Sequence, residues 1–470
     1  MFDAVTALYA TKSSSCRLYR QLIGIRSEEE TGVVREFGQK QLACSHLNDS
    51  QSKAVNAATR YPLMLLWGPP GTGKTHTVVQ ILKQLLLLHP DHRFLVTAPT
   101  HNAVDNLMQR FMQESDAELT TREPLRVSTD LNKVASALRQ YTCDAMVGKD
   151  LSEGFAGRSQ AQKRVRDSTL IFTTCAGAAL GLLRSEEFGI VVVDEASQIT
   201  EPGTLIPLTK GCQHAVLVGD HVQLRATVQR SAVLTGHDVS LFERLYTAPD
   251  RNDVAKVMLD TQYRMHPDLC AFSSNAFYDG KLQTAAGLEQ LELPVSQFPW
   301  PAKARKIFVQ CLEAEDIGRQ SKSNQGQVRL CKTICNLLST APASANGRKE
   351  DPMGEEAKPK IAMLTPYTRQ REALQIALPG YTISSIDGFQ GREADIVIFV
   401  TVRCNAHHDI GFLSDLRRLN VVMTRARRGV IIIGHRSTLT VQADEDGVDE
   451  SKRVWRQLIE SCSSVEIEQD

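Results

Sequence analysis

Short runs of apolar residues alternate with longer amphipathic stretches along most of this chain. In the first half, apolar runs of strand length cover 63–67, 94–98, 170–176, 190–193 and 215–218. A second series, again with helical patterns between the runs, covers 306–310, 361–364, 381–384, 396–400 and 430–433. Strands that are apolar on both faces are typical of parallel sheets covered by helices. The pattern therefore predicts an α/β protein with two such units in tandem.

The same pattern sets the expected domains. Residues 1–46 form an N-terminal segment of unknown role, and residues 47–250 form the first domain. Residues 251–440 form the second domain, and residues 441–470 form a C-terminal tail. Polar residues 115–168 predict a mostly helical insertion between two strands of the first domain. Residues 341–360, rich in Ala, Pro, Gly, Lys and Glu, predict a disordered loop inside the second domain.

Composition narrows the class of protein without identifying a partner. Lys plus Arg and Asp plus Glu both number 54, so any basic groove for nucleic acid must be local. Among the 11 cysteines only Cys331 and Cys335 approach a ligand-like spacing, which favours buried thiols in a reducing compartment over a zinc site. No apolar run approaches the roughly 20 residues that span a bilayer, and no signal-peptide pattern opens the chain. We expect a cytoplasmic or nuclear protein with no membrane partner.

A glycine-rich loop joins the first predicted strand to the first strongly predicted helix. The loop consists of Gly68, Pro69, Pro70, Gly71, Thr72, Gly73, Lys74 and Thr75. Glycines let the backbone curl so that its N–H groups point at phosphate oxygens, and the helix N-terminus adds partial positive charge. Lys74 can reach the outer phosphates, and the Thr75 hydroxyl can hold a magnesium ion. A plain glycine turn would not need Lys and Thr at its end, so we predict a phosphate-binding loop.

Two adjacent carboxylates follow the apolar strand at 190–193. Asp194 is placed to bind magnesium, and Glu195 to orient or deprotonate an attacking water. Two acids at a strand end could instead cap the next helix, and this segment alone leaves that alternative open. Gln223 follows the strand at 215–218 and would lie near the γ-phosphate if the strands are neighbours.

Three further residues give weaker signals. Gln51 lies about 20 residues before the glycine-rich loop, and its amide offers both a donor and an acceptor that could read an adenine edge. The second domain has no glycine-rich loop of this kind, but it carries Arg264 and Arg425 at expected strand or loop ends. A single arginine at such a place is usually part of a surface salt bridge.

Taken together and in order, these segments resemble the motifs of superfamily-one helicases. The match is strongest to the branch that includes the nonsense-mediated-decay helicase and senataxin. Motifs I, Ia, II, III, IV, V and VI correspond to 68–75, 98–107, 194–198, 218–224, 262–267, 387–393 and 419–428. The stretch 402–413 is similar to the branch's connection between the last two motifs.

The resemblance implies a fold, a reaction and a partner. It implies two tandem RecA-like domains with parallel sheets, the phosphate-binding loop in the first. It implies hydrolysis of ATP with Mg²⁺ in a cleft between the domains, and single-stranded RNA or DNA bound across both. It also implies translocation in the 5′-to-3′ direction. Protein partners do not follow from it.

The resemblance also assigns roles to individual residues. Lys74 and Thr75 match the phosphate and magnesium ligands, and Asp194 and Glu195 match the magnesium-organising and catalytic carboxylates. Gln223 matches the γ-phosphate sensor. Gln51 matches the glutamine that reads adenine, Tyr263 the residue that stacks on that base, and Glu393 the acid that contacts the ribose. Arg264 and Arg425 match the two arginine fingers.

Three departures from the branch bear on activity. The small β-barrel that usually precedes the first domain is expected to be reduced or missing, and the Cys/His-rich zinc module is expected to be absent. Motif III continues with Arg225-Ala226 where a proline is usual. The leading prediction is therefore an ATP-dependent helicase or translocase, and the alternative is an ATP-gated clamp that separates little duplex. A P-loop kinase or transporter ATPase would leave 390–393 and 424–427 without a purpose.

Overall fold

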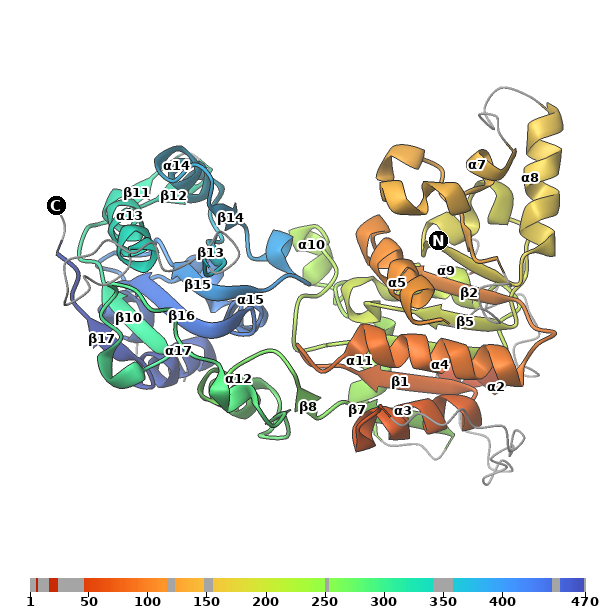
Figure 1. The fold of residues 1–470 in the computed structure, drawn as a ribbon, viewed down its shortest axis with the longest axis horizontal. Helices are drawn as coiled ribbons and strands as arrows, with labels where there is room; N and C mark the ends of the chain where they lie inside the picture. The colour runs from red at the N-terminus through yellow and green to blue at the C-terminus, as the bar shows by residue number, and fades with distance from the viewer. Residues whose placement is uncertain are drawn as a thin grey trace, which may run out of the picture. The chain divides into compact units, whose positions relative to one another are not determined.

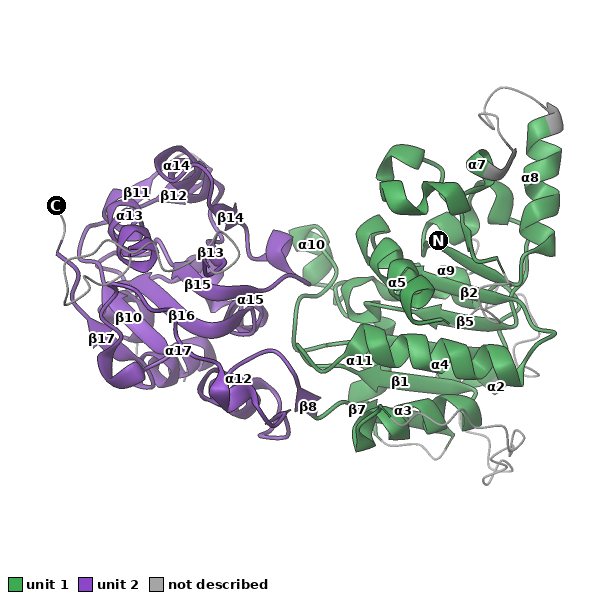
Figure 2. Cartoon of the chain, viewed as in Figure 1, with its two compact units in different colours: residues 1–260 green, residues 261–470 purple. Residues whose placement is uncertain are grey.

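The chain folds into two compact units, residues 1–260 and 261–470 (Figures 1 and 2). The structure, a computed structural model, describes residues 6, 17–23, 46–115, 123–147, 155–249, 253–318, 320–340, 358–441 and 449–468. Each unit is organised around one parallel sheet, which confirms the expected α/β fold. Most of the N-terminal segment 1–46 lies outside the described residues, as does the loop expected at 341–360 up to residue 357.

The sheet of the first unit has seven parallel strands in the order β3-β4-β2-β5-β6-β1-β7. Their bounds are β1 (Leu63–Trp67), β2 (Phe94–Ala98), β3 (Leu125–Arg126), β4 (Leu170–Thr174), β5 (Ile190–Val193), β6 (His214–Gly219) and β7 (Val254–Met258). All residues of β1, β2, β4, β5 and β6 are buried, as expected for strands covered on both faces. The carboxyl ends of β1, β5 and β6 therefore meet at one edge of the sheet.

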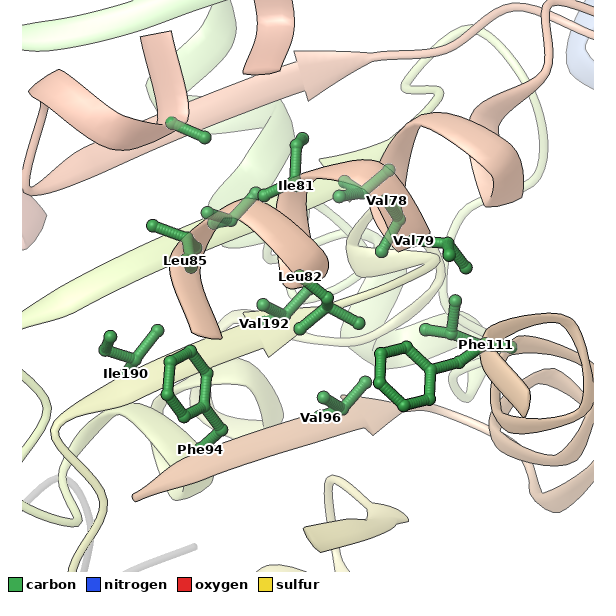
Figure 3. Packing of buried hydrophobic residues seen from close by; sticks show 14 of the residues in the cluster. Val78, Val79, Ile81, Leu82, Leu85, Phe94, Val96, Phe111, Ile190 and Val192 are labelled. Atoms are coloured by element: carbon green, nitrogen blue, oxygen red, sulfur yellow. The ribbon is translucent and has the colours of Figure 1, made fainter. Parts of the chain in front are cut away.

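Helices cover this sheet and complete its core. Their bounds are α2 (Arg17–Ile23), α3 (Asp49–Arg60), α4 (Lys74–Leu88), α5 (His101–Glu114), α7 (Cys143–Val147), α8 (Phe155–Asp167), α9 (Glu201–Leu208), α10 (Arg230–Val233) and α11 (Leu241–Thr247). Figure 3 shows α4 lying on the sheet, with Leu82 and Leu85 directed toward Phe94, Ile190 and Val192. The apolar stripe of α4 holds its first turn, where the glycine-rich loop ends, against the sheet.

The expected insertion contributes to the first unit's sheet as well as carrying helices. Strand β3 pairs with β4, and Arg126 within it is completely buried. Arg126 Nε donates to Asp105 Oδ1 of α5 at 2.7 Å, so the burial of its charge is compensated by a carboxylate. Val134 and Leu138 of the insertion pack into the same core as α4.

The sheet of the second unit has six parallel strands in the order β14-β13-β15-β16-β10-β17. Their bounds are β10 (Lys306–Gln310), β13 (Ile361–Leu364), β14 (Thr382–Ser384), β15 (Ala394–Val400), β16 (Ala426–Gly434) and β17 (Ser463–Val465). Short strands β8 (Thr261–Gln262) and β9 (Gln283–Thr284) pair with each other, as do β11 (Asp316–Ile317) and β12 (Lys322–Ser323). The five apolar runs of the second series overlap β10, β13, β14, β15 and β16.

The helices of the second unit are α12 (Pro267–Phe277), α13 (Gln325–Ser339), α14 (Thr368–Ala377), α15 (Leu416–Met423), α16 (Arg436–Thr440) and α17 (Glu450–Glu460). Cys331 and Cys335 lie on α13 and are fully buried in the core. Within the residues that the structure describes, no group of three His, Cys, Asp or Glu side chains is arranged to hold a metal ion. Across those same residues no helix is long and apolar enough to cross a bilayer.

Two edge strands differ from the expected domain plan. β7 pairs with β1, so residues expected to open the second domain close the first sheet instead. β17 pairs with β10, so 441–470 is not only a tail but also supplies α17 and one strand of the second sheet. Polar Lys256 interrupts β7, and two serines open β17. Edge strands tolerate such residues, which is why a search for apolar runs passes over them.

Candidate nucleotide-binding site

The glycine-rich loop connects β1 to α4 and is shaped by two left-handed glycines. Gly71 has φ of 75° and Gly73, the residue before α4, has φ of 77°. Such values are costly for residues with a Cβ. A Cβ on Gly68 would lie 2.0 Å from Lys74 Cγ, because the lysine side chain folds back over the loop. Lys74 Nζ donates to the Gly68 carbonyl at 3.0 Å.

The acidic end of β5 lies against this loop. Lys74 Nζ is 4.0 Å from Glu195 Oε1, so the structure brings together the lysine and the second carboxylate. Glu195 has a left-handed φ of 51°, a conformation that is uncommon outside glycine and clusters at functional sites. Gln198 Nε2 donates to Glu195 Oε2 at 2.6 Å and orients that carboxylate.

Asp194 is buried at the tip of β5. Burial and the neighbouring Glu195 raise the pKa of its carboxyl to about 7, and the nearby Lys74 lowers it in part. A cation held by this carboxylate would relieve the cost of its charge. Carboxylate and hydroxyl oxygens are the ligands that Mg²⁺ prefers. Asp194 and the Thr75 hydroxyl, which follows Lys74, therefore fit a magnesium ion.

Gln51 lies against the same loop from α3. Its Nε2 donates to the Thr72 carbonyl at 3.2 Å, and a Cβ on Gly73 would come within 2.8 Å of that nitrogen. The Gln51 Oε1 accepts from the Asn48 N–H at 3.2 Å, which completes a capping box at the start of α3. The sequence signal for Gln51 was weak, and the structure places the side chain at the loop.

Gln223 is held at the end of β6. Its Nε2 donates to Asp220 Oδ2, and Trp67 Nε1 donates to Asp220 Oδ1 at 2.8 Å. Register explains this meeting, because Trp67 lies opposite Gly219 in the pairing of β1 with β6. Sequence reasoning missed Asp220 and Trp67. The tryptophan directly before the loop and the acid directly after an apolar strand were the available signals.

Arg225 lies between Leu224 and Ala226, and the branch usually has a proline two residues after that leucine. Its Nε donates to Glu243 Oε2 and its Nη1 to Asp238 Oδ2, both at 2.8 Å. These contacts tie the segment after Gln223 to α11. Two ion pairs therefore hold this segment in place.

The second unit brings Arg264, Glu393 and residues of motif VI together. Arg264 Nε is 2.6 Å from Glu393 Oε2, and Arg264 Nη1 donates to the Thr424 carbonyl at 3.2 Å. Glu393 thus has an arginine partner within its own unit. Tyr263, next to Arg264, is 48% exposed.

Arg425, which the resemblance assigns as an arginine finger, is buried within the second unit and only 2% exposed. Its Nε donates to the Val421 carbonyl at 3.0 Å, and its Nη2 donates to Thr424 Oγ1 at 3.0 Å. These bonds fix the guanidinium at the junction of α15 and β16, so Arg425 supports the segment that carries Arg427 and Arg428.

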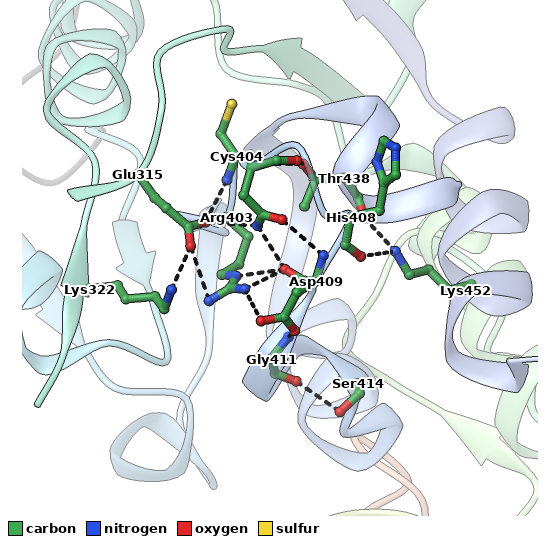
Figure 4. A network of polar contacts seen from close by, with 11 residues as sticks. Glu315, Lys322, Arg403, Cys404, His408, Asp409, Gly411, Ser414, Thr438 and Lys452 are labelled. Atoms are coloured by element: carbon green, nitrogen blue, oxygen red, sulfur yellow. Dashed lines mark hydrogen bonds and ion pairs between the residues drawn. The ribbon is translucent and has the colours of Figure 1, made fainter. Parts of the chain in front are cut away.

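A buried ion-pair network shapes the segment 402–413 (Figure 4). Arg403, 2% exposed, has Nη1 at 3.2 Å from Glu315 Oε1 and donates from Nε to the Asp409 carbonyl at 2.8 Å. Lys322 Nζ is 2.6 Å from the same Glu315 oxygen. The network fixes the loop that follows the carboxyl end of β15. Phe412, which lies in this loop, is 60% exposed. Sequence reasoning noted this segment only as a connection.

Comparison with known proteins agrees with the motif order. Two family models match the chain, and both describe an AAA domain. One matches residues 46–155 and 155–231, and the other matches 237–437. The matches together reach into both units.

Several curated proteins are similar to most of this chain. It is 35% identical over 464 residues to the Regulator of nonsense transcripts 1 homolog of Drosophila melanogaster, covering 90% of this chain and 38% of that protein. It is 33% identical over 470 residues to ATP-dependent helicase NAM7 of Saccharomyces cerevisiae, covering 91% of this chain and 46% of that protein. The chain thus spans less than half the length of these relatives.

Among solved structures, the Arterivirus nonstructural protein 10 helicase aligns with a TM-score of 0.39 and 15% identity, covering 82% of this chain and 61% of that chain. The fold assignment rests on the strand order of the two sheets. The family rests on sequence identity across both units and on the ordered motifs. The chain belongs to the superfamily-one helicases, in the branch that includes the regulators of nonsense transcripts.

Proposed function

We propose that this chain is an ATP-dependent helicase or translocase that acts on single-stranded nucleic acid. The observation that carries the proposal is the 4.0 Å approach of Lys74 Nζ to Glu195 Oε1 beside the glycine-rich loop. A cation for phosphate and a carboxylate for water are the two groups that hydrolysis of a nucleoside triphosphate needs side by side. The named activities of the similar proteins support the same reaction.

In this proposal, the phosphate-binding loop and the side chains around it each contribute one function to ATP hydrolysis. The loop N–H groups and Lys74 bind the β- and γ-phosphates, in place of the Gly68 carbonyl that Lys74 contacts in the structure. Thr75 and Asp194 hold magnesium, which neutralises charge on the phosphate oxygens when bound. Glu195 orients the attacking water and accepts its proton, while Gln223 lies near the γ-phosphate.

Residues of both units complete nucleotide recognition in this proposal. Gln51 exchanges its bond to Thr72 for the adenine edge, Tyr263 stacks on the base, and Glu393 contacts the ribose. Arg264 is the stronger candidate for an arginine finger, because its ion-pair partner Glu393 is 44% exposed, although Arg264 would also have to leave the Thr424 carbonyl. Arg425 is buried and would have to leave the Val421 and Arg392 carbonyls.

Single-stranded RNA or DNA is the proposed partner, and 5′-to-3′ is the proposed direction of movement. The alternative of an ATP-gated clamp differs only in the yield of separated strands. RNA and DNA offer the same backbone charge. We therefore propose the shared class of single strands, and the test below compares the two polymers.

The test measures ATP hydrolysis with matched RNA and DNA oligonucleotides, single-stranded and double-stranded. We expect single strands to raise the hydrolysis rate at least about tenfold and Lys74→Ala to remove the activity with either polymer. Hydrolysis that no nucleic acid changes would contradict the proposal and favour a P-loop enzyme of another kind. The stronger stimulating polymer identifies the working substrate.

A further inference from the structure

A buried carboxylate links the strand before the phosphate loop to Gln223. Asp220, 1% exposed, follows Gly219 at the end of β6. Oδ1 accepts from Trp67 Nε1 at 2.8 Å, and Oδ2 accepts from Gln223 Nε2. Trp67 is the last residue of β1, and the next residue begins the loop.

The Val222 N–H also donates to Asp220 Oδ1, at 3.3 Å, so the carboxylate accepts at both of its oxygens. An ionised carboxylate only accepts hydrogen bonds, and an indole N–H only donates. The amide nitrogen of Gln223 must therefore face Asp220, which turns its carbonyl oxygen away from the carboxylate. Bonds between a donor and an ionised acceptor are stronger than neutral ones. Asp220 thus sets which end of the Gln223 amide faces outward.

Neighbouring contacts keep this arrangement in place. The Asp220 N–H donates to Ser197 Oγ at 3.0 Å, and a Cβ on Gly219 would lie 2.9 Å from the Ser197 backbone nitrogen. The segment that carries Glu195 is therefore packed tightly against the end of β6. The Trp67 ring also contacts the Tyr246 ring of α11 edge-on, with 5.3 Å between centroids.

We propose that Trp67 and Asp220 are positioning residues that hold the Gln223 amide with its oxygen toward the attacking water. The inference deepens the proposed function and rests on it, since Gln223 acts only if ATP is hydrolysed beside Lys74 and Glu195. A water that attacks phosphorus needs an acceptor for its hydrogen atoms, and a fixed amide oxygen supplies one besides the Glu195 carboxylate. Because Trp67 adjoins Gly68, a shift of the loop would also move the residue that holds Asp220.

The test compares Trp67→Phe with Trp300→Phe, a matched change in the second unit. Phenylalanine keeps most of the aromatic contact and removes the N–H, so one charge-assisted hydrogen bond is lost. We expect kcat for ATP hydrolysis to fall about tenfold in Trp67→Phe, with KM changed less than about threefold. Trp300→Phe should stay within about twofold of wild type. A Trp67→Phe enzyme with wild-type kcat would overturn the inference.

Two further variants separate positioning from a general loss of structure. If Trp67 acts through Gln223, Trp67→Phe combined with Gln223→Ala should be no slower than Gln223→Ala alone. Fully additive losses would contradict the inference, and so would wild-type turnover in Gln223→Ala. Asp220→Asn offers one oxygen and one amide nitrogen to two donors, so it should lower kcat even if Trp67→Phe fails to fold. In all arms, loss of hydrolysis in Lys74→Ala tests the proposed function separately.

Discussion

At the scale of single residues, Lys74 and Glu195 have opposite charges and different proposed functions, phosphate binding for Lys74 and activation of water for Glu195. Lys74→Ala removes the charge that holds the outer phosphates, so we expect loss of both hydrolysis and most nucleotide affinity. Glu195→Gln keeps the shape of the side chain but cannot take a proton from water, so it should retain nucleotide binding and lose hydrolysis. Nucleotide titration and phosphate release, measured on both variants, check this. Equal nucleotide affinities for the two variants would contradict the division of tasks.

Arg264 offers a test of the arginine finger with little risk to the fold. Its partner Glu393 is 44% exposed and stays hydrated when the arginine is removed, and the change unpairs one main-chain carbonyl, that of Thr424. We expect Arg264→Ala to lower the stimulated hydrolysis rate by about 10³-fold or more, the range of arginine fingers in other P-loop enzymes.

Arg329→Ala is the control for that experiment. Arg329 lies on α13, outside the helicase motifs, and pairs with Glu313, with the two side chains 48% and 39% exposed. Exposed ion pairs contribute about 0–1 kcal/mol, so Arg329→Ala should stay within a few-fold of wild type. Similar rates for the two variants would remove Arg264 from the mechanism. Arg425→Ala is a poorer probe, because it unpairs main-chain carbonyls and should lower stability.

At the scale of elements, Arg403 and Glu315 fix the loop after β15. Glu315→Ala removes the carboxylate that Arg403 and Lys322 share, while Arg403 keeps its ion pair with Asp409. Because a fully uncompensated buried charge costs about 3–5 kcal/mol, we expect Glu315→Ala to lower the free energy of unfolding by less than that, about 1–3 kcal/mol, measured by urea denaturation. Asp316→Ala is the neighbouring control, since its pair with Arg369 is exposed and should contribute about 0–1 kcal/mol. Equal effects of the two variants would refute the buried network's role.

His214 opens β6 and gives the first unit a defined pH dependence. Burial, and then the nearby His89, lower the pKa of His214 to about 4 from its ordinary 6.5. Between those values the unfolded chain binds a proton that the folded chain excludes, so stability falls as pH drops from about 6.5 to about 4. The loss reaches about 3 kcal/mol at the lower end. His214→Asn should flatten the pH dependence measured by urea unfolding, and an unchanged slope would exclude this origin.

Sequence patterns predicted the elements whose residues are buried on both sides. The runs at 63–67 and 190–193 coincide with β1 and β5, and the loop between β1 and α4 follows from its glycines and Lys74. The pattern did not predict the edge strands β7 and β17, because an edge strand needs few apolar residues. It also did not predict the contacts of Asp220 and Arg403. Each depends on partners far apart in the chain, and no local pattern records which partner a charged residue meets.

At the scale of the whole molecule, the proposed reaction needs both units. The phosphate loop and the two carboxylates belong to 1–260, whereas Arg264 and Glu393 belong to 261–470. An arginine that engages phosphate only in one arrangement of the units would make that arrangement depend on ATP. Repeated binding and hydrolysis would then alternate two arrangements, which is what movement along a strand requires.

Strand displacement on tailed duplexes tests this account most directly. The substrates are one duplex with a single-stranded 5′ tail and the same duplex with a 3′ tail, each with ATP and magnesium, and with Glu195→Gln as the inactive control. We expect the wild-type protein to separate only the 5′-tailed duplex, and Glu195→Gln to separate neither. Stimulated ATP hydrolysis without separation would favour the ATP-gated clamp. Separation only from a 3′ tail, or separation that continues in Glu195→Gln, would contradict the account.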